Sequence, residues 1–389
     1  MRIFVLGTGS TGALLARLLA RQGHRVTCGD KDIERARRFL GKGSDLPLVA
    51  VNARNLRGVI RAARGSHLLV NASPAVFNEI ILRAALHLRA HYLDLSAHLN
   101  RTPFKAEQFA YDARFVAKRR VAIITAGVAP GLTNLLAARA ADTLDKVDSI
   151  HIRLYENTES DNPISQWSAE SSFDEAVSRP RVVRNGRFQF AKRFSERERF
   201  RFAPPIGEVN VVLLAQDEVG TLRQNIAVAD LDVKIGGNEI DRLRRWYRQG
   251  KLRRSQGPVT SRFPSTSTPR QIARLIRRGR VQNARFAAAV IVRGTKRDQP
   301  VEIRFDMTCP SLYQLLRRGL AVTPIAYATA QMAALFVRHF PRRLHGVFAP
   351  NALPVAVRRA ILADARQNGI GISMRANVRK EVLADDEEL

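Results

Sequence analysis

Three glycines near the start of the chain give the clearest sign of chemistry. Residues 2–6 have the composition of a buried parallel strand, and the G-x-G-x-x-G loop after them consists of Gly7, Thr8, Gly9, Ser10, Thr11 and Gly12. In such a loop the first glycine allows the tight turn, the second lets a pyrophosphate approach the backbone, and the third lets helix and strand pack closely. We therefore predict that this loop binds the phosphates of a dinucleotide at the N-terminus of a helix over 13–21.

The end of the second predicted strand, residues 25–29, bears on the choice of cofactor. Asp30 follows this strand at close to the spacing of about 20 residues that is expected for a carboxylate on the ribose 2′-hydroxyl, which favours NAD. Lys31 and Arg35 could instead meet the 2′-phosphate of NADP, with Asp30 turned aside. We expect NAD and keep NADP as the alternative.

Further polar residues stand where predicted strands end. Ligands of a parallel sheet bind outside the carboxyl ends of its strands. The fourth strand, over 67–72, ends in a segment that we expect to border the cofactor, namely Asn71, Ala72, Ser73 and Pro74. The same rule places Asp94–Ala97 and residues 126–131 along this edge.

The elements that must position these residues fall into two patterns. Strands and helices alternate up to about residue 125, which predicts an α/β Rossmann domain with a doubly wound parallel sheet. From about residue 145 the hairpin signals Asn185-Gly186 and 294–298 predict an α+β domain with an antiparallel sheet. We divide the chain into a dinucleotide-binding domain (1–125), an α+β domain for substrate or dimerisation (126–320) and C-terminal helices returning to the Rossmann domain (321–389).

The chain is strongly basic, with 64 Lys and Arg against 35 Asp and Glu and a net charge of +29. Nucleic-acid binding would explain this charge, and so would a biased composition or an acidic substrate. Because the basic residues are dispersed and lack interleaved aromatics, specific nucleic-acid binding is not expected. No signal peptide, no apolar run of about 18 residues and no metal-ligand cluster are visible, so we expect a cytoplasmic protein without membrane contact or metal.

Several segments together resemble the saccharopine dehydrogenase-like family, which includes lysine 6-dehydrogenases and related amine-forming reductases. They lie at 70–78 with 92–96, at 126–137, at 162–168, and at 323–328 with 346–350. The resemblance implies an NAD(P)-dependent oxidoreductase, a homodimer, that acts on a C–N bond of an amino-acid-derived amine such as saccharopine or lysine. One departure is Pro350-Asn351, where the family usually has Pro-Glu, so a role for that acid is in doubt here.

This chemistry suggests roles for two residues near the fifth predicted strand. Asp94 could take up the amine proton or pair with the substrate ammonium, and otherwise is a helix cap or a loop hydrogen-bonding group. His98 could be a proton shuttle or a plain surface residue. We propose both as catalytic candidates.

A loop shaped by Gly127, Pro130 and Gly131 precedes a predicted helix at Leu132–Ala141. The free N–H groups of that helix could bind a carboxylate or border the nicotinamide. Asn134 is a candidate polar group for orienting the substrate.

Two further substrate-binding candidates lie in the second domain. Trp167 packs at the domain interface or lines the substrate cleft, and Arg223 stands in a T-L-R segment similar to the saccharopine-reductase branch, whose arginine binds a substrate carboxylate. The competing hypothesis for the whole chain is a redox-inactive regulator that binds a dinucleotide and an anionic partner.

Overall fold

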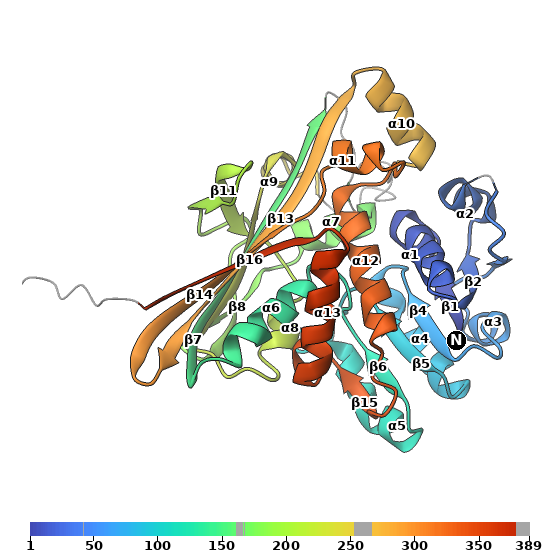
Figure 1. The fold of residues 1–389 in the computed structure, drawn as a ribbon, viewed down its shortest axis with the longest axis horizontal. Helices are drawn as coiled ribbons and strands as arrows, with labels where there is room; N and C mark the ends of the chain where they lie inside the picture. The colour runs from blue at the N-terminus through green and yellow to red at the C-terminus, as the bar shows by residue number, and fades with distance from the viewer. Residues whose placement is uncertain (42, 161–165, 167, 253–266, 379–389) are drawn as a thin grey trace, which may run out of the picture.

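The computed structural model describes residues 1–41, 43–160, 166, 168–252 and 267–378. A seven-stranded parallel sheet positions the candidate site (Figure 1), and its strands are β1 (Arg2–Leu6), β2 (Arg25–Asp30), β3 (Leu48–Ala50), β4 (Leu68–Asn71), β5 (His91–Asp94), β6 (Val121–Ile123) and β15 (Gly346–Phe348). Their order is β15-β6-β5-β4-β1-β2-β3. The direction of winding reverses between β1 and β4, so the crevice for a dinucleotide lies at their carboxyl ends. The predicted doubly wound sheet is confirmed.

Helices follow these strands, namely α1 (Ser10–Arg21), α2 (Ile33–Leu40), α3 (Leu56–Ala62), η1 (Ala75–Phe77), α4 (Asn78–His87), η2 (Glu107–Tyr111) and α5 (Asp112–Ala117), and α6 (Leu132–Ala141) leads from β6 to the second sheet. Side-chain caps start two of them, since Asp32 accepts from Arg35 N and Asn55 from Gly58 N. The short helix η2, which leads into α5, begins at Glu107. The backbone before it turns where the N–H of Lys105 donates to the carbonyl of Thr102 at 3.1 Å, and the N–H of Ala106 then donates to Gly220 O in the second part of the chain.

The second sheet is mixed, which corrects the expectation of an antiparallel sheet. Its nine strands are β7 (Lys146–Ser160), β8 (Arg181–Arg184), β9 (Arg187–Phe190), β10 (Glu198–Phe202), β11 (Gly207–Leu213), β12 (Asp230–Gly236), β13 (Val281–Lys296), β14 (Gln299–Thr308) and β16 (Gly371–Val378). Most neighbours are antiparallel, but β12 runs parallel to β7. The helices here are α7 (Ala169–Val177), α8 (Val219–Leu222), α9 (Asn238–Arg248), α10 (Pro269–Arg277) and α11 (Leu312–Arg317).

The C-terminal part of the chain contributes to both sheets. Helix α12 (Pro324–Arg338) is almost entirely buried and packs against α1, and α13 (Val355–Gln367) packs against α12 (Figure 1). Strand β15 joins the first sheet beside β6, whereas β16 extends the second sheet beside β14. A continuous apolar core runs through both parts, from Ile3 and Leu135 to Ile152 and Met332. Within the described ranges, no helix has the length and apolar character to cross a membrane.

Candidate functional site

The three glycines of the loop differ in what surrounds them. Gly7 has φ +94°, and a Cβ there would lie 2.6 Å from the backbone of Ala72. A Cβ on Gly12 would collide with the carbonyl oxygen of Gly7, whereas a Cβ on Gly9 would meet nothing within 4 Å. Gly7 and Gly12 are therefore required by packing, while Gly9 faces the open space that a bound pyrophosphate needs.

The N-terminus of α1 is left open at this loop. Gly9 precedes the helix without a side-chain cap, and the first turn carries no acidic residue. The N–H groups of Ser10, Thr11 and Gly12 have no protein acceptor among the residues described. Unpaired N–H groups at the positive end of a 12-residue helix suit a phosphate, so the residues present fit a dinucleotide.

Asp30 is fixed at the end of β2 by its own backbone neighbours. Its Oδ2 accepts from the N–H of Thr8 at 2.7 Å and its Oδ1 accepts from the N–H of Asp32 at 3.0 Å. Lys31 is exposed beside it, and the guanidinium of Arg35 lies 5.0 Å from the ring centre of Phe39. Each carboxylate oxygen keeps a lone pair for a ribose hydroxyl, as NAD requires. Asp30 is not turned aside, so a 2′-phosphate would depend on the neighbouring cations Lys31 and Arg35.

Asn71 shapes the segment after β4 instead of facing the crevice. Its amide donates to Asn78 Oδ1 at 2.6 Å, and its Oδ1 accepts from the N–H of Ser73 at 2.9 Å. Ala72 and Ser73 place their backbone against Gly7. Asn71, Ala72, Ser73 and Pro74 thus adjoin the glycine loop, as the position of β4 next to β1 requires.

Asp94 is fully buried, and protein donors occupy both of its carboxylate oxygens. Its Oδ1 accepts from the N–H of Thr125 at 2.7 Å, and its Oδ2 accepts from Gln108 Nε2 at 3.0 Å. Burial raises the pKa of Asp94 to about 7, although these hydrogen bonds oppose the shift. The carboxyl group joins the ends of β5 and β6, which corresponds to the structural alternative of a loop hydrogen-bonding group.

His98 lies where the loops of the first sheet contact the segment around α8 of the second domain, a region that we call the seam between the two sheets. Its Nδ1 is 3.2 Å from Glu107 Oε2, and the N–H of neighbouring Ala97 donates to Asp217 Oδ2 at 2.9 Å. Glu79, His98 and Glu107 converge closely enough to hold a metal ion. The guanidinium of Arg101 already bridges Glu79 and Glu107, so the charge of this group is compensated by the chain itself.

The N–H groups at the start of α6 are not free, contrary to the sequence-based expectation. Gly131 N donates to Asn134 Oδ1 at 3.1 Å, Leu132 N to Gly127 O at 3.0 Å, and Thr133 N to the carbonyl of Val128 at 3.1 Å. The backbone from Gly127 through Pro130 to Gly131 folds back on itself. The approach is so close that a Cβ on Gly131 would collide with Gly127 O, so only glycine fits at position 131. This loop can shape the site, but its N–H groups have no capacity left for a carboxylate.

Asn134 belongs to a buried polar network that joins three parts of the chain. Its amide donates to Thr221 Oγ1 at 2.9 Å and to Asn351 Oδ1 at 3.2 Å. Asn351, where the resembling family has an acid, also faces Asn225 Oδ1 at 3.3 Å. The asparagine is therefore accommodated by amide and hydroxyl partners, and no charge is needed at this position.

Four carboxyl groups that the sequence did not single out gather around α8. They come from β7, α7 and the segment leading into α8, and they are Glu156, Glu175, Asp217 and Glu218. Burial raises the pKa of Glu218 to about 7 and, with the charge of Glu239, that of Glu156 to about 8. Burial and the charges of Glu156, Asp217 and Glu218 together raise the pKa of Glu175 well above the ordinary value. We call these four residues the acidic cluster.

The acidic cluster lines the seam instead of lying in a closed core. Glu156, Glu175 and Asp217 are each surrounded by protein, yet each keeps part of its surface accessible. No member forms an ion pair with a residue in the described part of the chain. One oxygen of Glu218 accepts from Thr133 Oγ1 at 3.0 Å, while the other is buried without a partner. Raised pKa values in accessible side chains at a seam are typical of functional sites.

Arg223 ends α8 next to this cluster. Its Nε is buried and has no hydrogen-bond acceptor in the described structure. A buried guanidinium nitrogen without a partner is costly unless a ligand satisfies it. Trp167, the other candidate of this domain, lies outside the described residues.

Comparison with known proteins agrees with this geometry. Residues 3–123 match the family described as the saccharopine dehydrogenase NADP binding domain. A carboxynorspermidine synthase of Vibrio cholerae is 27% identical over 176 residues, which cover 39% of this chain and 42% of that protein. The match thus spans less than half the length of this relative.

Two solved structures resemble the whole chain. Saccharopine dehydrogenase (L-Glu forming) from Saccharomyces cerevisiae has a TM-score of 0.70 at 11% identity, covering 97% of this chain and all of that one. Homospermidine synthase from Legionella pneumophila, in complex with NAD, has a TM-score of 0.71 at 13% identity, covering all of this chain and 95% of that one. These likenesses show a shared fold.

Proposed function

Because residues 3–123 match the saccharopine dehydrogenase NADP binding domain family, we propose that the chain is an oxidoreductase that acts at a C–N bond. The substrate is an amine derived from an amino acid, of the saccharopine or lysine type or of the related polyamine type. The observation that carries the proposal is the acidic cluster at the seam between the two sheets, next to Arg223. Arg181 and His98 act on Asp217 and Arg242 acts on Glu156 only at longer range, so the four carboxyl groups keep capacity for an ammonium group, and the buried Nε of Arg223 suits a carboxylate.

The chain's own residues have separable roles in this proposal. NAD(P), when bound, supplies or accepts the hydride at the carbon that bears nitrogen. The acidic cluster holds the ammonium group, and Arg223 orients the substrate through its carboxylate. Glu218, whose pKa is about 7 and whose second oxygen has no partner, exchanges the amine proton near neutral pH. Asp94 and Asn134 act indirectly, because their hydrogen bonds hold the surrounding loops.

The polyamine type receives support from two sources. The relatives include proteins named homospermidine synthase and carboxynorspermidine synthase. The acidic cluster also contains more carboxyl groups than one ammonium group can neutralise, so it favours a substrate with two or more cationic nitrogens. A redox-inactive regulator would gain nothing from burying four acids at this seam, since unpaired buried charges destabilise a fold.

A coupled assay tests the proposal. Oxidation of NADH and of NADPH is followed with lysine or a diamine together with a 2-oxo acid or an aminoaldehyde, and NAD reduction is followed with lysine or saccharopine. We expect turnover with at least one pair, and none with a Gly9→Val variant, which cannot hold the pyrophosphate. If the wild-type protein binds dinucleotide but turns over no pair, the regulator hypothesis is favoured instead.

A further inference from the structure

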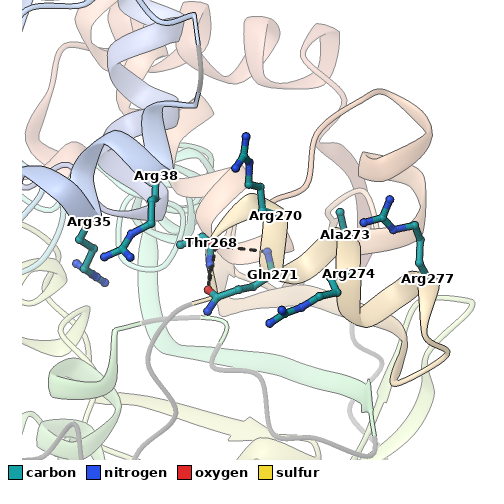
Figure 2. Close-up of a pocket in the computed structure, with 8 residues that line it drawn as sticks. All are labelled: Arg35, Arg38, Thr268, Arg270, Gln271, Ala273, Arg274 and Arg277. Carbon is teal, nitrogen blue, oxygen red and sulfur yellow. Dashed lines mark hydrogen bonds between the residues drawn. The ribbon is translucent and has the colours of Figure 1, made fainter.

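A groove with an arginine lining separates helix α2 of the first domain from helix α10 of the second (Figure 2). It has a volume of about 710 Å³. Five guanidinium groups line it, two from α2 and three from α10, and they belong to Arg35, Arg38, Arg270, Arg274 and Arg277. The remaining lining residues, Thr268, Gln271 and Ala273, carry no charge.

The five arginines have no anionic partner among the residues that the structure describes. None of them forms an ion pair with a carboxylate within the described ranges, and no acidic side chain lines the groove. Elsewhere in the second domain arginines are well paired, as Arg153 is with Glu198 and Asp232. Like charges that line one groove repel, and a bound anion would relieve that repulsion.

Both helices have capped N-termini, which fix the backbone from which the arginines extend. Helix α2 begins with a cap in which Asp32 accepts from the N–H of Arg35 at 2.9 Å. Helix α10 begins with a capping box between Thr268 and Gln271, and Pro269 occupies its first turn. On α10 the spacing of four and three residues between Arg270, Arg274 and Arg277 places them on one helix face.

We propose that this groove binds phosphate groups between the two domains. Planar guanidinium groups form paired hydrogen bonds with phosphate oxygens, and several of them together can neutralise a multiply charged anion. Helix α2 starts three residues after Asp30, so the groove adjoins the ribose end of the proposed dinucleotide site. The phosphate is either the 2′-phosphate of NADP, in which case the inference rests on the proposed cofactor site, or part of a free polyphosphate.

Calorimetric titration at about 0.15 M ionic strength, where surface charges are screened beyond about 8 Å, tests the proposal. The probes are inorganic tripolyphosphate, NADPH and NADH, each added to the wild-type protein and to the double variant Arg270→Gln/Arg274→Gln. We expect the variant to lose about tenfold or more in affinity for tripolyphosphate, for NADPH, or for both, with NADH unchanged. Arg35→Gln, on the opposite wall, should reproduce this loss.

Competition between the probes identifies the source of the phosphate. If tripolyphosphate displaces NADPH but not NADH, the groove binds the 2′-phosphate. If tripolyphosphate binds together with NADPH, the groove serves a free polyphosphate.

Arg187→Gln is the matched control, because Arg187 is exposed on β9 and does not line the groove. The proposal is overturned if the groove variants behave like this control. It is also overturned if wild-type protein ignores tripolyphosphate and binds both dinucleotides equally. A lack of amine turnover would count against the proposed function but would leave these titrations untouched.

Discussion

The carboxyl group of Glu218 should contribute to how tightly the acidic cluster holds an amine, besides exchanging its proton. Glu218→Gln keeps the hydrogen bond from Thr133 but removes the negative charge from the acidic cluster. A hydrogen bond to a charged group contributes about 1.5–3 kcal/mol, so KM for the amine should rise about 10- to 100-fold. Steady-state kinetics measures this rise, and the Kd for NADH, measured separately, should stay the same.

Asp298→Asn provides the matched control for this charge change. Asp298 is exposed at the tip of the β13–β14 hairpin and has φ +59°, a conformation that asparagine also adopts. The control should leave KM unchanged. If Glu218→Gln gives the same kinetics as the control, Glu218 has a structural role only.

The glycine loop allows binding and folding to be separated. Gly9→Val fills the open space in front of α1, so it should weaken dinucleotide binding at least about tenfold while the free energy of unfolding changes by about 0.5 kcal/mol or less. Gly12→Ala forces a Cβ against Gly7 O and should cost about 1–3 kcal/mol of stability. Denaturant unfolding and NADH titration on both variants test the pair, and a Gly9→Val protein that binds NADH normally would contradict the assignment.

Single residues differed in how far the sequence could place them. The glycine loop was predictable, because its spacing reflects backbone geometry that is local. Asp94 was singled out for its place after β5, but burial and the partners Thr125 and Gln108 are tertiary facts. Glu156 and Glu175 were not predicted as site residues, because only the tertiary fold brings them close to Glu218 and nothing near them in the sequence indicates it.

The elements that carry the acidic cluster should make stability and amine affinity respond to pH in opposite directions. Burial raises the pKa of Asp94 and Glu218 to about 7 and of Glu156 to about 8. Because these groups bind their protons more tightly when folded, their contribution to stability is complete below the unfolded pKa, near 4 to 4.5, and is lost as pH rises through 7 to 8. Ionised carboxylates hold an ammonium group better, so amine affinity should rise over the upper part of this window.

Thermal unfolding between pH 5 and 8.5, with and without a diamine, measures both trends. The protein alone should lose up to about 1.4 kcal/mol per pH unit for each such group, and the diamine should offset part of this loss at high pH. Glu218→Gln should flatten the slope of the unliganded protein. A stability that rises steadily with pH in this window would contradict the assignment.

Elements formed by distant strand pairing escaped prediction. The alternating pattern up to residue 125 indicated six of the seven strands of the first sheet, because each βαβ unit is complete within a short segment. Strand β15 is three residues long and pairs with β6, more than two hundred residues earlier. The parallel pairing of β12 with β7 was missed because hairpin signals report only neighbouring strands.

Across the whole molecule, the net charge is positive, whereas the seam between the two sheets carries the carboxyl groups of the acidic cluster. The chain carries +29, a charge that an acidic substrate would explain. The acidic cluster instead gives the seam a negative character, while unpaired arginines collect in the groove between α2 and α10. Overall charge therefore describes the outer surface and does not identify the substrate.

This separation predicts how the protein behaves toward nucleic acid. Dispersed arginines should bind DNA weakly and without sequence preference. The affinity should fall steeply as the salt concentration rises, because the release of counterions from the DNA then becomes less favourable. Because the phosphate backbone would contact the outer surface, saturating DNA should leave the KM for the amine unchanged. Filter binding of two unrelated duplexes between about 50 and 200 mM salt, alongside kinetics with added DNA, measures both effects. Tight binding to one duplex at the higher salt, or loss of turnover on adding it, would instead favour the regulator hypothesis, since only a dedicated surface resists such screening.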